Sequence, residues 1–161
     1  MESGTGHASM GEGKMSNHYP MLWVNLVLGA IIMYLGMFAM IWSSGEFVQN
    51  INFAYMALIM WAPMSAVMLW TMRSMYPNNR LNLGLYALFA LVFILSLMGM
   101  RDQLLVGDRQ FLRSMIPHHS GAILMCERAT ITDPEIASLC DGIVRSQAQE
   151  IAQMKAILNR R

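Results

Sequence analysis

The chain has 161 residues and a mass of 18.2 kDa, which leaves room for one domain or for a small domain with a membrane anchor. Only 13% of the residues are charged and 55% are hydrophobic, and this composition argues against a soluble globule with an ordinary charged surface. The net charge of +1, with no basic stripe, gives no case for nucleic-acid binding.

Residues 1–20 are small, polar and aperiodic, and they predict a disordered tail that carries a few Met and His residues. Three uncharged apolar segments follow, at 21–42, 51–72 and 81–100. Each is long enough to cross a hydrocarbon core of ~30 Å at ~1.5 Å per residue. Trp and Tyr residues lie near their ends, where an interfacial belt would place them. We therefore predict three transmembrane helices, in a region spanning 21–100.

The distribution of positive charge predicts how these helices are oriented. Loop 43–50 contains no Lys or Arg, whereas loop 73–80 contains Arg73 and Arg80. The positive-inside rule then puts loop 73–80 in the cytoplasm and the C-terminal segment outside it. Three arginines just beyond the third apolar segment favour the opposite orientation weakly.

The C-terminal segment, 101–161, holds 8 of the 11 Lys/Arg and 7 of the 10 Asp/Glu residues, and it has the pattern of a helical hairpin. Apolar residues recur at three- and four-residue spacing from Asp108 to about Ala129. A break follows at 130–134, where Thr132 to Glu135 has the form of a capping box. Two amphipathic helices bury little alone, so we expect the bundle to be completed by another copy or by the membrane helices.

The motif with the clearest chemistry is Met115-Ile116-Pro117-His118-His119, because two imidazoles on an apolar stripe are costly unless they are hydrogen-bonded or bind a metal. On a helical wheel Met115, His118, His119, Ala122, Met125 and Cys126 fall within an arc of ~120°. Thioether and imidazole together select Cu(I) over zinc or magnesium. The plain alternative is that one His is a hydrogen-bonded core residue, the other is solvated, and the methionines only pack.

An antiparallel turn near residue 132 predicts which residues face each other across the hairpin. It sets Cys126 opposite Cys140, His119 opposite Gln147, and Met115 opposite Glu150. The favoured interpretation of the two cysteines is a pair of small buried hydrophobic residues. A disulfide across the hairpin is the alternative if this segment lies outside the cytoplasm.

The apolar segments carry methionines of their own, in stripes at helical spacing. The second segment has a ladder at four-residue intervals, and the first has a shorter stripe; the members are Met56, Met60, Met64, Met68 and Met72, and Met33, Met37 and Met40. A soft cation could hop between such sulfurs. We favour the alternative that they fill gaps in helix packing, because no acidic residue lines these segments to drive transport.

The run from Asp108 to Met125, with its MIPHH core, and the downstream pattern Gln147-x-x-Glu150-Ile151-x-x-Met154 resemble the bacterial family known as domain of unknown function 305. The resemblance covers about residues 105–158 and implies a ferritin-like helical bundle, export or membrane attachment, and copper binding. The resemblance also implies which residues are the candidate metal ligands: Met115, His118, His119, Met125 and Met154. Many members carry two hairpins, so this single hairpin implies a homo-oligomer, and the overall arrangement resembles a membrane-bound subgroup.

The sequence thus predicts an all-α protein with three transmembrane helices and a terminal hairpin, which is half of a ferritin-like bundle. We expect a non-enzymatic protein of the bacterial inner membrane that sequesters or transfers Cu(I), with copper, the lipid bilayer and further copies of itself as partners. One alternative is a helical scaffold without a metal role. A di-iron enzyme is disfavoured, because the Glu-x-x-His pairs of such sites are absent.

Overall fold

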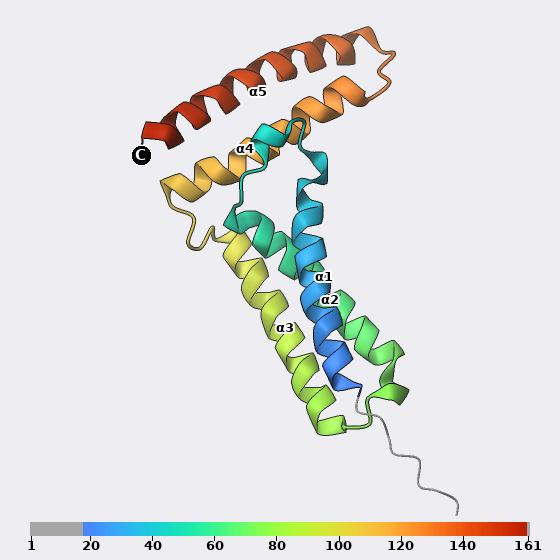
Figure 1. Cartoon of the computed structure of the whole chain (residues 1–161). Helices are drawn as coiled ribbons and strands as arrows, with labels where there is room; N and C mark the ends of the chain where they lie inside the picture. The colour runs from blue at the N-terminus through green and yellow to red at the C-terminus, as the bar shows by residue number, and fades with distance from the viewer. Residues whose placement is uncertain (1–17, 161) are drawn as a thin grey trace, which may run out of the picture.

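A computed structural model describes residues 18–160, and within that range every regular element is a helix (Figure 1). Three helices form the lower part of the molecule: α1 (Tyr19–Gly36), α2 (Ile51–Thr71) and α3 (Asn79–Arg101). Two more, α4 (Asp108–Arg128) and α5 (Pro134–Arg160), lie across its upper end. Short 3₁₀ turns complete the chain, namely η1 (Met37–Met40), η2 (Ser44–Glu46) and η3 (Arg73–Met75). The predicted all-α fold is confirmed.

Three stretches are long and apolar enough to cross a membrane, at Tyr19–Met40, Ile51–Thr71 and Asn79–Arg101. The first differs from the predicted segment, because helix begins at Tyr19 and tightens into η1 after Gly36. Pro20 explains the early start, since its fixed φ suits the first turn of a helix. Of the predicted tail, residues 1–17 lie outside the described residues.

The three spans pack around a core that runs along α2, whose buried members include Leu26, Leu69 and Phe89. The Trp61 indole, a polar group beside this core, is paired as hydrocarbon requires: it donates to the Leu26 carbonyl at 2.8 Å. Gly99 lets α3 approach α2 closely, because a Cβ at that position would lie 2.8 Å from the Tyr55 ring. The spans therefore form a packed unit on which the upper helices rest.

Side-chain caps set where several helices begin. Asn50 accepts a hydrogen bond from the Phe53 amide at 2.8 Å and starts α2, and Asn78 does the same for α3. At α5 the cap is Asp133, whose carboxylate accepts from the amides of Glu135 and Ile136. The predicted capping box assigned this role to Thr132, one residue too early, because Pro134 occupies the first position of the helix.

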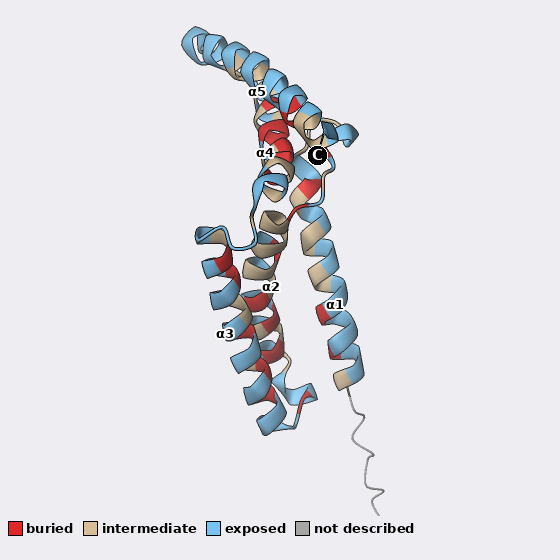
Figure 2. Ribbon diagram, turned by 90° about the vertical axis from the view of Figure 1, so that its left-hand side faces the viewer, coloured by how far each residue is buried: buried red, intermediate tan, exposed pale blue. Residues whose placement is uncertain are grey.

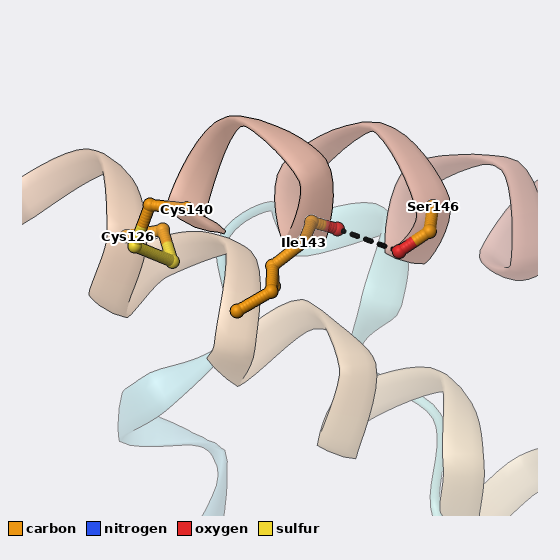
Figure 3. The surroundings of a disulfide bond; sticks show 4 residues. All are labelled: Cys126, Cys140, Ile143 and Ser146. Carbon is orange, nitrogen blue, oxygen red and sulfur yellow. Dashed lines mark hydrogen bonds between the residues drawn. A yellow bond between two sulfur atoms is a disulfide. The ribbon is translucent and has the colours of Figure 1, made fainter. Parts of the chain in front are cut away.

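α4 and α5 form the predicted antiparallel hairpin. Ile116, Ile123, Ile151 and Met154 form the buried cluster between them, and Figure 2 shows buried stretches of α4 in red. A disulfide joins Cys126 to Cys140, with Cα atoms 5.3 Å apart, one turn from the Ser146–Ile143 hydrogen bond of α5 (Figure 3). The predicted pairing of these positions is confirmed. The favoured interpretation of two separate buried thiols is wrong, since their spacing brings the sulfurs together across the hairpin.

The hairpin is docked on the spans through α4, which contacts η1, η2 and α2. Gly121 permits this approach, because a Cβ there would lie 3.4 Å from the Met40 carbonyl oxygen. α5 lies on the other side of α4 and buries only Ile151 and Met154. α4 is thus a middle layer, with α5 above it and the upper ends of α1 and α2 below.

Candidate metal site

The residues of the predicted ligand stripe on α4 lie at two edges rather than on one face. At ~100° per residue, Met115, Cys126 and His119 span ~40° of the wheel, while Met125, His118 and Ala122 occupy the ~60° arc on the opposite side of Met115. α5 covers the first group, and the second faces the upper ends of α1 and α2. The two histidines, with ring centroids 6.1 Å apart, therefore have different surroundings.

His119 lies at the α5 edge and is buried, with 8% of its surface exposed. Its Nδ1 lies 3.0 Å from a carboxylate oxygen of Glu150, although the alignment falls short of a hydrogen bond. Burial lowers the pKa of His119; the Glu150 carboxylate acts in the opposite direction, and His118 adds to the lowering. The predicted partner was Gln147, one turn earlier on the same face of α5.

Two predicted ligands at this edge are packing residues in the described structure. Met154 is 8% exposed within the core of the hairpin, and Met115 packs against that core. Cys126, the third group at this edge, is held in the disulfide. The α5 edge therefore has the features of a helix–helix interface, with one paired imidazole in it.

His118 and Met125 line a cavity of about 440 Å³ between α4 and the spans. Its other donors are thioethers from η1 and α2, namely Met37, Met40 and Met56. The remaining lining is small or apolar: Gly36, Phe53, Pro117, Gly121 and Ala122. The cavity is accessible from outside, because Met40, Met56 and Met125 are 53%, 36% and 59% exposed.

The described side chains that line this cavity include no charged donor group. Four thioethers and one imidazole line it, and none of the described residues around it is a carboxylate, Lys or Arg. Three other cavities, of about 210 to 250 Å³, have no Met, His or Cys in their linings. Across residues 18–160 no group of three His, Cys, Asp or Glu could hold a metal ion. The candidate donors that do gather among the described residues are the thioethers beside His118 at this junction.

A buried polar network holds α4 in place above this cavity. Glu46 of η2 is 5% exposed, and its carboxylate accepts from the Ser120 hydroxyl at 3.2 Å and from the Lys155 ammonium at 2.9 Å. The Ser120 oxygen in turn accepts from the Trp42 amide at 2.6 Å, and the Trp42 indole donates to Glu127 at 2.6 Å. The loop between the first two spans is therefore bonded to both helices of the hairpin.

Residues 100–158 match the family described as a domain of unknown function, DUF305. The uncharacterized protein L153 of Acanthamoeba polyphaga mimivirus is 32% identical over 121 residues, which cover 74% of this chain and 78% of the viral protein. This chain belongs to the DUF305 family. No solved structure matches it.

The DUF305 segment coincides with the hairpin, while the likeness to the viral protein is too long to be confined there and takes in part of the region of the spans. Within the segment, the MIPHH motif supplies both edges of α4. Its methionine and second histidine face α5, and its first histidine faces the cavity. The motif thus contributes residues both to the interface between α4 and α5 and to the cavity between α4 and the spans.

Sequence reasoning did not connect the span methionines with His118, nor did it find the Glu46 network. A signal for the network was available, because Glu46 is the only charged residue between Lys14 and Arg73. An isolated carboxylate in a short loop between two spans has no neighbouring charge, so it needs partners from elsewhere in the fold. For the methionines no comparable signal existed, since the ladder continues with equal spacing away from the cavity.

Proposed function

We propose that this DUF305 protein is a membrane-anchored, non-enzymatic binder of Cu(I) that sequesters or transfers the ion at the cell envelope. The observation that carries the proposal is that His118 and Met125 line one cavity in which every other donor is a thioether. Thioethers are soft ligands and imidazole is a neutral ligand that suits copper, so four thioethers with one imidazole favour a monovalent soft ion over zinc or magnesium. His119 contacts Glu150, and its role would be to orient the motif rather than to coordinate the copper ion.

The arrangement of the chain supports an orientation with the hairpin outside the cytoplasm. The segment η3, which contains Arg73, lies at the opposite end of the spans from the hairpin (Figure 1), and such positive loops are retained in the cytoplasm. The Cys126–Cys140 disulfide at the hairpin end needs an oxidising compartment. Both features agree with a protein of the bacterial inner membrane whose hairpin lies in the periplasm or outside the cell.

A homo-oligomer is part of the same proposal. α5 has 27 residues, of which only Ile151 and Met154 are buried, and its exposed apolar residues include Ile136 and Leu139. A second hairpin packed on this face would complete a four-helix bundle. The oligomeric mass of the detergent-purified protein tests this part, and a monomeric mass would contradict it.

The test of copper binding uses the full-length protein in detergent, titrated anaerobically with Cu(I) against a colorimetric chelator. We expect stoichiometric binding by the native chain and an affinity at least tenfold weaker for His118→Gln. No binding by the native chain above that of the buffer would contradict the proposal. The scaffold alternative predicts that His118→Gln leaves the copper tolerance of cells unchanged, whereas the copper proposal predicts that it falls.

A further inference from the structure

We infer that the Cu(I) site is shared between the hairpin and the membrane spans, with thioethers of Met37, Met40 and Met56 completing the coordination begun by His118 and Met125. The inference rests on the proposed function and specifies the ligands of that site. It departs from the expectation of a site contained within the hairpin, because three of the five donors lie outside the DUF305 segment at 100–158.

The hairpin alone does not offer enough donors on one side. Of the five predicted ligands, Met115 and Met154 pack between α4 and α5, and His119 contacts Glu150. Only two, His118 and Met125, reach the cavity. Additional thioethers would bind a soft monovalent ion more tightly than one thioether and one imidazole alone. The additional donors must come from the surface that faces α4, which consists of η1 and the first turns of α2.

The span methionines at the junction are placed to meet that need. Met37 and Met40 stand on η1, three residues apart, and Met56 stands on the second turn of α2. The three belong to the two methionine stripes of the first and second spans: Met37 and Met40 end the first stripe, and Met56 begins the second. Their neighbours along the ladder, Met60 and Met64, are 48% and 59% exposed and do not line the cavity.

The fold holds the two halves of the site together. Gly121 brings α4 against the Met40 backbone, and Glu46 bonds the loop after η1 to Ser120 and Lys155. These contacts reach α4 at Ser120 and Gly121, within one turn of His118, so they fix the distance between the hairpin donors and the span donors. The site would thus place a bound ion at the boundary between the membrane and the hairpin.

The test compares four full-length chains in detergent: native; His118→Gln/Met125→Leu; Met37→Leu/Met40→Leu/Met56→Leu; and the matched control Met60→Leu/Met64→Leu/Met98→Leu. Leu preserves the volume and hydrophobicity of Met, and the control residues are exposed span methionines outside the cavity. Cu(I) affinity is measured against a chelator, and X-ray absorption at the copper edge counts sulfur neighbours.

We expect both cavity variants to bind Cu(I) at least tenfold more weakly than the native chain, with fewer sulfur neighbours in the span variant. The control should stay within twofold. If only the hairpin variant weakens binding, the shared site is wrong and the proposed function stands. If neither does, the cavity is not the Cu(I) site and the inference is wrong, whereas an absence of binding by the native chain would overturn the proposed function. A control that weakens as much as the span variant also overturns the inference, because loss of sulfur anywhere in the spans would then suffice.

Discussion

The two edges of α4 carry the same kinds of side chain and use them differently. At the α5 edge a methionine, a histidine and a cysteine are packed, paired with Glu150 or oxidised to a disulfide. At the edge facing the spans a histidine and a methionine line a cavity, with small residues beside them. The residue types do not decide the role; the element that covers each edge does.

This contrast assigns separate tasks to the two halves of the MIPHH motif. α5 covers its own edge through an apolar core, so substitutions there are expected to alter stability. The spans leave a cavity at the other edge, so substitutions there are expected to alter ligand binding with little effect on stability. The two edges can therefore be distinguished by measuring stability and Cu(I) affinity on the same variants.

The largest difference is expected between two methionines of the predicted ligand set. Met154→Ala removes a side chain that is 8% exposed and should destabilise the hairpin by about 2–5 kcal/mol, because it leaves a cavity in the core. Met125→Ala removes one that is 59% exposed and should cost within about 0.5 kcal/mol. Amide hydrogen exchange in peptides from α4 and α5 measures both. Equal protection in the two variants would show that the edges do not differ in packing.

Removal of the disulfide is expected to have the next largest effect. Cys126→Ser/Cys140→Ser releases a cross-link between residues 14 apart and should cost about 3 kcal/mol, since loops of that size lose this much entropy when closed. The thermal midpoint in detergent measures the loss. Cu(I) affinity should remain within twofold, because neither sulfur lines the cavity. A large loss of affinity would mean that the disulfide supports the site.

The helices and the contact between the two cysteines could be predicted from the sequence. The difference between the two edges of α4 could not, and the reason is physical. Uncharged apolar stretches predicted three membrane-length helices, and the spacing of Cys126 and Cys140 predicted their contact, because both are local or depend on one turn. The helical wheel placed His118 and His119 within one arc. It could not show that α5 covers only part of that arc, since the width of a contact depends on where the neighbouring helix lies.

That the span methionines line the same cavity as His118 could not be predicted from the sequence, for a similar reason. Met37 and Met56 belong to stripes that packing alone explains, and nothing in their spacing distinguishes them from Met60 or Met64. What distinguishes them is the position of α4 over the upper ends of α1 and α2. That position depends on long-range contacts such as Glu46 with Lys155, which are 109 residues apart.

The hydrogen bonds of Glu46 can be removed to test whether they hold the cavity edge of α4 against the spans. Glu46→Gln removes the charge that pairs with Lys155 and should weaken the docking of α4 by about 1–3 kcal/mol, the cost of an unsatisfied buried hydrogen-bonding group. Faster amide exchange in the loop 41–50 and in α4 would report it. Glu127→Gln is the matched control, because Glu127 accepts a hydrogen bond from Trp42 of the same loop but is exposed, whereas Glu46 is buried. If both variants exchange alike, the network does not hold the hairpin in place.

The smallest effect on stability, and the sharpest contrast in function, is expected for the two adjacent histidines. His118→Gln changes an exposed residue in the cavity and should alter stability by within about 0.5 kcal/mol. His119→Gln disturbs a buried residue beside Glu150 and should cost about 1 kcal/mol or more, because a buried polar contact is lost. Cu(I) affinity should follow the reverse order, with the greater loss in His118→Gln. A greater loss in His119→Gln would place the metal at the α5 edge and reverse the assignment of the two edges.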